Sequence, residues 1–310
     1  MLVLRYVLVF LCCSMHCAFA QQTAFHAKNS NKQTQFSYKW KEHDKTYNLS
    51  FSIPNTTLYA MPASPASFNQ QLLIDSVYRS VMLHAKTIDP RVARIRVRKA
   101  RDGLSFNVQS SQNADEILAQ LSAANEQAKQ AYLDEKMLVA HQVVNNNTSL
   151  RHDYTKYVSL SSSSLKVVAD AIAEIQQNKS PREFVEIALS WIQTIPYNTI
   201  ESRLNSNGSG FISPRDLLVQ NKGDCDSKST LLAALLKAYN PRLNVQMVYL
   251  SDHALLALAI KPKPTDITVK QQGIEYVLIE PTGPAQYPIG EVSDSTNISL
   301  HNRQFSMIKL

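Results

Sequence analysis

Cysteine is scarce in this sequence of 310 residues, and three of the four cysteines, at positions 12, 13 and 17, fall within the first 20 residues. Only Cys225 lies beyond that segment. A chain without residues 1–20 therefore has no pair of cysteines and no internal disulfide. One cysteine and scattered histidines also provide no ligand cluster at the spacing of a zinc site. We therefore expect neither a metal nor another cofactor.

Long apolar runs are also missing after residue 20, which excludes an integral membrane span there. Within residues 1–20, Arg5 precedes an apolar run over 6–13, and the small-residue site Ala18-Phe19-Ala20 follows. This order is typical of a cleavable signal peptide, so we expect an exported protein, periplasmic or secreted. One alternative is an uncleaved anchor, although the run is shorter than the ~20 residues that cross a bilayer. The other is a lipoprotein, although the cysteines lack the usual small-residue context.

The sequence has only a small excess of positive over negative side chains. Without Arg5 the 32 Lys and Arg fall to 31, against 25 Asp and Glu, which leaves a formal charge of +6. This is a mild bias toward anionic partners. Arg94, Arg96 and Arg98 recur on alternate positions, so they form either a solvated strand face or a site for an anionic envelope component. No aromatic residue interleaves with them, and we expect no nucleic-acid partner.

The first half of the chain alternates strand and helix patterns. Residues 21–34 are polar without apolar periodicity, which predicts a flexible N-terminus. Alternation over 36–40 and 47–53 predicts a β-hairpin. Helical spacing follows over 72–85. The run 145–149 is rich in Asn and reads as a linker, so we expect a smaller α+β domain of hairpins and helices over 35–150.

A second hairpin is predicted inside that domain. Ile95 and Val97 would face Phe106 and Val108 across an Asp102-Gly103 turn. After this hairpin, a stretch rich in Ala, Leu and Glu predicts one helix over 115–141.

The second half, 151–310, places helices before strands. Ser180-Pro181 and Ser213-Pro214 each combine a capping serine with proline at the first helical position, which predicts two helix starts. A leucine-rich helix follows Cys225, and strands are predicted over 245–250, 254–260 and 274–280. This order predicts an α+β domain in which a helix packs on an antiparallel sheet.

Cys225 stands at the predicted start of the leucine-rich helix. A helix N-terminus offers partial positive charge and free N–H groups, which favour a thiolate and an oxyanion. Asp224 is the expected cap, and Gly223 would permit a sharp turn into the helix. The alternative is a buried, inert cysteine.

A base and an orienting group complete the candidate site. His253 opens an apolar strand, where its ring could emerge at the edge of a core, and Glu280 ends another apolar strand and precedes Pro281. A carboxylate in that position needs a partner, and a histidine would serve. The alternatives are an ordinary core or surface histidine and a solvent-facing glutamate.

These residues occur in a recognisable order. Gly223-Asp224-Cys225 with its leucine-rich helix, Asp252-His253-Ala254 and Glu280-Pro281-Thr282 resemble motifs of the transglutaminase-like superfamily, which is related to papain. The resemblance covers roughly 165–285 and implies a bacterial-type, exported thiol enzyme with Cys225 as nucleophile, His253 as base and Glu280 as orienting acid. The family usually has Asp where Glu280 stands. Gln220 lies five positions before Cys225, closer than the oxyanion glutamine of papain-type enzymes.

The resemblance implies amide chemistry on a peptide or protein substrate. Release of the acyl-enzyme by water would make a cysteine peptidase or amidase, and release by an amine would make a transglutaminase. We favour hydrolysis for an exported protein. The alternative is a non-catalytic module that binds a peptide or an envelope component, although an exported free thiol without a task would be easy to lose.

Overall fold

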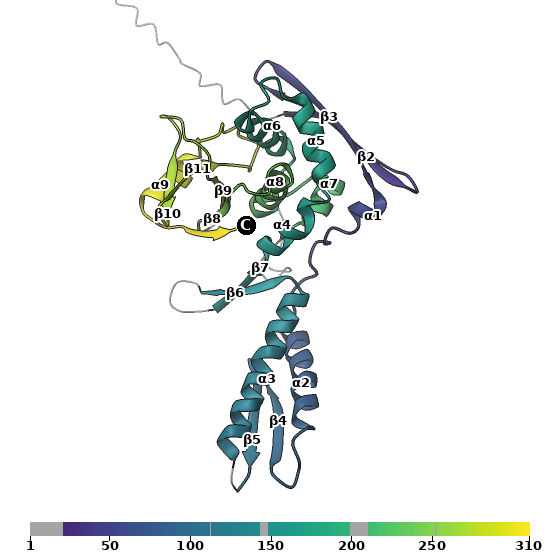
Figure 1. Cartoon of the computed structure of the whole chain (residues 1–310), viewed down its shortest axis with the longest axis vertical. Coiled ribbons are helices and arrows are strands. Elements are labelled where there is room, and N and C mark those ends of the chain that lie inside the picture. The colour runs from purple at the N-terminus through teal and green to yellow at the C-terminus, as the bar shows by residue number, and fades with distance from the viewer. Residues whose placement is uncertain (1–20, 112, 143–147, 199–209, 252) are drawn as a thin grey trace, which may run out of the picture.

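A computed structural model of the chain describes residues 21–111, 113–142, 148–198, 210–251 and 253–310. The predicted signal peptide, 1–20, lies outside the described residues, and so do Asp252 and residues 145–147 of the predicted linker. The described part is a mixed α+β structure whose sheets are antiparallel, as predicted (Figure 1). None of its helices has the length and apolar character that crossing a membrane requires.

Three antiparallel strands begin the described chain: β1 (Gln21–Asn29), β2 (Gln33–Glu42) and β3 (Lys45–Pro54). The predicted hairpin is confirmed as β2 and β3, where Phe36 pairs with Phe51 and the alternating apolar residues share a buried face. The prediction of a flexible segment over 21–34 is wrong, because β1 pairs along its length with β2. Main-chain hydrogen bonds hold this strand, so it needs no apolar period of its own.

The main body combines helices with a second sheet. Its helices are α1 (Asn55–Leu58), α4 (Tyr154–Ser162), α5 (Lys166–Ile175), α6 (Pro181–Thr194), α7 (Pro214–Gln220), α8 (Cys225–Tyr239) and α9 (Asp294–His301). Its five-stranded sheet has the order β10 (Thr268–Gln271), β11 (Ile274–Ile279), β9 (Ala254–Leu258), β8 (Val245–Tyr249) and β12 (Ser306–Lys309). Helix α8 is buried around almost its whole circumference and packs beside β9. This is the predicted arrangement of a helix on an antiparallel sheet.

The sheet of β1–β3 belongs to this main body. Its apolar face and the helices α4–α8 share one core. The Trp40 indole donates a hydrogen bond to Ser190 Oγ at 3.0 Å, and the Tyr38 ring meets Trp191 edge-on. The predicted separate domain over 35–150 therefore differs from the structure, in which residues 36–61 complete the core of the second half.

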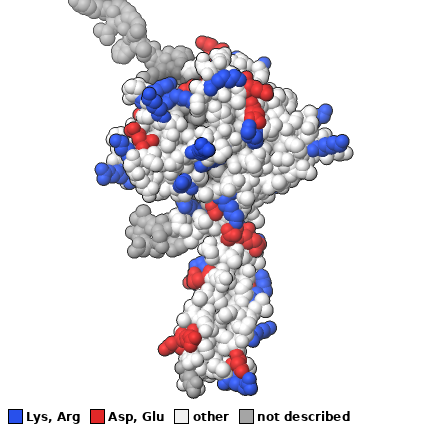
Figure 2. Space-filling view, in the orientation of Figure 1, with Lys and Arg blue, Asp and Glu red and all other residues white. Residues whose placement is uncertain are grey.

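A lobe with its own small core extends from the main body (Figure 1). It consists of α2 (Gln70–Ala85), β4 (Arg94–Ala100), β5 (Gly103–Gln109) and α3 (Ala114–Glu135). The predicted second hairpin is confirmed, with Ile95 opposite Val108 and Val97 opposite Phe106. Figure 2 shows cationic and anionic side chains interspersed on the visible face of the lobe.

The arginine stripe lies on the outer face of this hairpin. Arg94, Arg96 and Arg98 are exposed, and none of them forms an ion pair with a described residue. The alternating Ile95 and Val97 turn inward toward the helices of the lobe.

The long helix predicted over 115–141 ends earlier, at Glu135. Met137 adopts a left-handed backbone with φ 53°, which a helix does not accommodate. The chain then enters β6 (Leu138–Gln142), which pairs with β7 (Thr148–His152). This hairpin leads from the lobe into α4 and the main body (Figure 1).

Candidate active site

Cys225 is the first residue of α8, as predicted, and is half-buried. The Asp224 carboxylate caps the helix by accepting a hydrogen bond from Ser227 N at 3.2 Å. Gly223 lies where a side chain would collide, because an added Cβ would stand 2.7 Å from Leu217 Cδ1. The thiol therefore lies at a capped helix N-terminus, where the helix dipole and free N–H groups favour negative charge.

His253 and Glu280 meet as predicted. His253 Nε2 lies 2.8 Å from Glu280 Oε1 and 2.9 Å from Oε2. The register explains the meeting, since Ile279 at the end of β11 pairs with Leu256 of β9, and His253 immediately precedes β9. The Glu280 carboxylate is almost fully buried, so its charge needs this partner.

The thiol completes the constellation. The Cys225 side chain interacts with His253, and this interaction helps to raise the pKa of the imidazole. Because Glu280 engages Nε2, Nδ1 is the ring nitrogen left for the thiol. Burial lowers the pKa of His253, but the hydrogen bonds and negative charges of Cys225 and Glu280 outweigh burial and raise it to about 10. The imidazole therefore holds its proton at neutral pH.

A buried lysine lies one helical turn below the cysteine. Lys228 has no exposed surface, and its Nζ donates a hydrogen bond to Ile195 O at 2.5 Å. Burial lowers its pKa to about 8, against the opposing negative charges of Asp224, Cys225 and Glu280. The ammonium is therefore charged at pH 7 and favours the anionic forms of the groups around it. Sequence reasoning missed Lys228, although a lysine within an otherwise apolar helix is a usable signal.

Two aspartates and two tyrosines surround the helix start. Asp226 Oδ2 accepts a hydrogen bond from Tyr154 OH at 2.5 Å. Burial raises the pKa of Asp224, and the charge of the neighbouring Asp226 raises it further. Tyr249 ends β8, pairs with Ala254 next to His253, and has a buried hydroxyl. Asp224 was expected as the cap, whereas the roles of Asp226, Tyr154 and Tyr249 were not, because these groups come together only through the sheet and helix packing.

Gln193 links α6 to the strand end that carries Glu280. Its Nε2 donates to Glu280 O at 2.8 Å and to Tyr287 O at 2.9 Å. A Cβ on Gly283 would stand 1.8 Å from Gln193 O, so this segment runs directly against the helix. The hydrogen bond from Gln193 therefore fixes the backbone of Glu280. Gln220, by contrast, is exposed at the end of α7, and among the described residues it forms no hydrogen bond with the triad.

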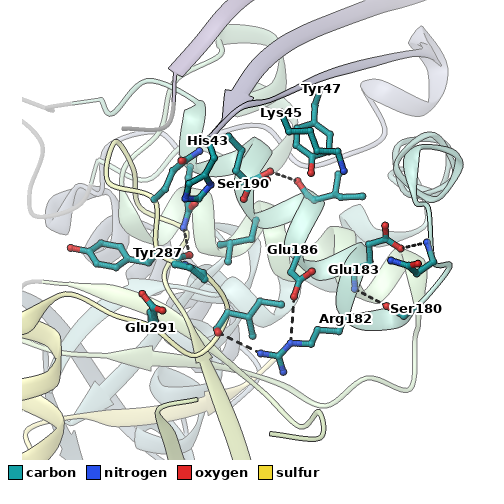
Figure 3. A pocket seen from close by; sticks show the side chains of 18 of the residues that line it. His43, Lys45, Tyr47, Ser180, Arg182, Glu183, Glu186, Ser190, Tyr287 and Glu291 are labelled. Carbon is teal, nitrogen blue, oxygen red and sulfur yellow. Dashed lines mark hydrogen bonds and ion pairs between the residues drawn. The ribbon is translucent and has the colours of Figure 1, made fainter. Parts of the chain in front are cut away.

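Gln193 also lines a cavity of about 800 Å³, which Figure 3 shows from close by. It is lined by the β2–β3 turn, the polar face of α6 and the segment 286–291, and neither Cys225 nor His253 contributes to it. Arg182 at its wall forms a two-pronged ion pair with Asp266 at 2.8 and 3.0 Å. The cavity is therefore separate from the triad.

No group of three or more His, Cys, Asp or Glu side chains in the described ranges has the arrangement of a metal site. No family model, curated protein or solved structure matches the chain. The assignment of chemistry therefore depends on the geometry around Cys225.

Proposed function

We propose that the chain is a thiol-dependent amide-bond enzyme in which Cys225 is the nucleophile, His253 the acid and base, and Glu280 the group that orients the imidazole. One observation carries the proposal: His253 is hydrogen-bonded to Glu280 and interacts with Cys225, which stands at a helix N-terminus. A nucleophile, a base and an orienting third group are the parts that covalent acyl transfer requires.

The chemistry runs in two halves. The Cys225 thiolate attacks the amide carbonyl carbon, and N–H groups at the start of α8 are placed to stabilise the resulting oxyanion. The His253 imidazolium gives its proton to the leaving amine as the carbon–nitrogen bond breaks, which leaves a thioester on Cys225. A water then attacks that thioester and gives a proton to His253, and the carboxylic acid leaves as the thiol is restored.

An amine in place of that water would make the product a new amide. We favour water, because the predicted signal peptide implies an exported protein. The proposed fold is transglutaminase-like, related to papain. Its support is the arrangement of a cysteine on α8, a histidine before β9 and an acid after β11, which is the order that the sequence resemblance implies.

Glu280 departs from the aspartate that the resemblance implies. The extra methylene raises the question whether the site is degenerate. Both oxygens of Glu280 lie within 2.9 Å of His253 Nε2, and Gln193 fixes its backbone. This geometry supports a site adapted to the longer side chain.

Acylation by p-nitrophenyl acetate tests the proposal without a known substrate. We expect mass spectrometry to find an acetyl group on Cys225, together with release of nitrophenolate. Cys225→Ala should abolish the acetylation, and His253→Ala should lower its rate by roughly 10²- to 10⁴-fold. Adding glycinamide separates the two fates, since water yields acetate and an amine acceptor yields an acetylated amide.

The same measurement can overturn the proposal. Acetylation of Cys225 at the rate of a free thiol, or an equal rate in the His253→Ala variant, would exclude an activated nucleophile. The non-catalytic module that binds a peptide or envelope component would then be the better explanation.

A further inference from the structure

Arg151 lies close to the triad, and no carboxylate among the described residues pairs with its charge. It lies in β7, and its guanidinium carbon stands 5.4 Å from the centre of the Tyr249 ring. Tyr249 in turn pairs with Ala254, the neighbour of His253, and its ring packs on the same core as α8. One aromatic side chain therefore separates the guanidinium from the catalytic edge of the sheet.

The guanidinium lies over an aromatic ring rather than against an anion. Arg151 is half-buried, and its Nε is buried without a hydrogen-bond partner. Among the described residues, no carboxylate pairs with it. Arg182 shows the usual arrangement, since its two terminal nitrogens each donate a hydrogen bond to a carboxylate oxygen of Asp266. A partly buried cation without an anion is costly unless a ligand completes it.

Asp226, the acid of the site whose charge acts on Tyr249, is already engaged. Asp226 accepts the Tyr154 hydroxyl at 2.5 Å and the Ser227 amide at 3.1 Å. Tyr249 feels both charges: burial raises its pKa, Asp226 raises it further, and Arg151 lowers it. The charge of Arg151 therefore acts on Tyr249 at the edge of the site. Among the described residues, no carboxylate occupies its N–H donors.

We propose that Arg151 is a specificity-determining residue that binds a carboxylate of the substrate, so that the site takes acyl donors with a negative charge close to the reacting carbonyl. This inference rests on the proposed function. A planar guanidinium matches the two oxygens of a carboxylate, and the cation–π contact with Tyr249 restricts where the guanidinium lies. A peptide with an acidic residue, or a free C-terminal carboxylate, beside the cleaved amide has this chemistry.

Two alkylating reagents of nearly equal shape test the inference. Iodoacetate carries a carboxylate and iodoacetamide does not, and both report on the Cys225 thiolate. We compare their second-order rates at pH 7, read from the mass of the Cys225 peptide. The iodoacetate-to-iodoacetamide ratio should fall roughly three- to tenfold in Arg151→Gln, as expected for the loss of one nearby charge. Arg151→Lys should keep part of the ratio.

Arg96→Gln is the matched control, because it removes one exposed arginine from the lobe and should leave the ratio unchanged. A merely structural role of Arg151 would change both rates by the same factor. In the unmodified chain, the ratio should also fall as salt rises, which tests the charge without any variant.

The outcomes distinguish a failure of the role proposed for Arg151 from a failure of the proposed enzyme function. An unchanged ratio in Arg151→Gln, with a reactive Cys225, would overturn the role of Arg151 and leave the proposed enzyme intact. If Cys225 reacts with both reagents no faster than free cysteine, the proposed function fails, and the substrate class fails with it.

Discussion

Both carboxylate oxygens of Glu280 lie within hydrogen-bond distance of a single nitrogen of His253, Nε2, at 2.8 and 2.9 Å. A two-oxygen contact of this kind sets both the orientation and the charge of the imidazole. It also shows how the longer acid is used, since the extra methylene carries the carboxylate up to the ring.

Glu280→Asp is therefore expected to reduce activity. The backbone of residue 280 is held by Gln193 and cannot advance to compensate for the shorter side chain. We expect a fall of roughly tenfold or more in the acetylation rate of Cys225, since one hydrogen bond to a charged group is worth about 1.5–3 kcal/mol. Glu280→Gln keeps the shape and one acceptor oxygen but loses the charge, so it should also slow acetylation without abolishing it. An Asp variant as fast as the unmodified chain would mark Glu280 as a remnant.

The titration of His253 gives a second prediction. Despite burial, its contacts with Cys225 and Glu280 raise its pKa from 6.5 to about 10. The ring should therefore stay protonated from pH 7 to 9 and lose its proton only as the pH rises through about 10. NMR of the ring resonances measures this midpoint directly. Glu280→Gln should lower the midpoint, because it removes a negative charge that favours the imidazolium. A midpoint near 6.5 in the unmodified chain would contradict the ion pair.

Much of the site was predictable because its signals are local. The serine–proline pairs at Ser180 and Ser213 mark helix starts through capping, and both helices begin there. Cys225 could be placed at a helix start for the same reason, since Asp224 is a cap. The alternation of apolar residues similarly predicted both hairpins.

The predictions that were wrong concern structure that depends on contacts between residues distant in sequence. Trp40 bonds to Ser190, 150 positions away, so no local pattern could reveal that the first sheet completes the second core. β1 has a polar sequence and takes its conformation from pairing with β2. Arg151 reaches the Tyr249 ring at the end of β8 only in the folded chain, and no local pattern in the sequence indicates this contact.

The arginine stripe provides a third prediction. Arg94, Arg96 and Arg98 are exposed on a strand face, which favours the solvated-face interpretation. Replacing all three by Gln should change the free energy of unfolding by no more than about 0.5 kcal/mol per site. Binding to vesicles with anionic lipids should fall no more than in a control that replaces the exposed Lys28, Lys32 and Lys39. A selectively larger loss with the arginine variant would establish the stripe as an anionic-envelope site.

Lys228 provides the last prediction, because it is a buried cation whose nearest charged groups are those of the site. Lys228→Met keeps most of the volume and removes the charge. We expect alkylation of Cys225 by iodoacetamide at pH 7 to slow by roughly tenfold, as expected for the loss of one nearby positive charge. Leaving Ile195 O without its donor should also cost about 1–3 kcal/mol of stability.

The pH dependence separates this electrostatic role from a packing role. The pKa of Lys228 is lowered to about 8, so the ammonium is charged below that pH and neutral above it. The difference in alkylation rate between the unmodified chain and Lys228→Met should therefore be largest below pH 8 and shrink above it. Lys237→Met, near the other end of α8, is the matched control and should show no such pH dependence. A rate difference that is constant across pH 8 would assign Lys228 to packing, because the removal of a side chain's volume does not titrate.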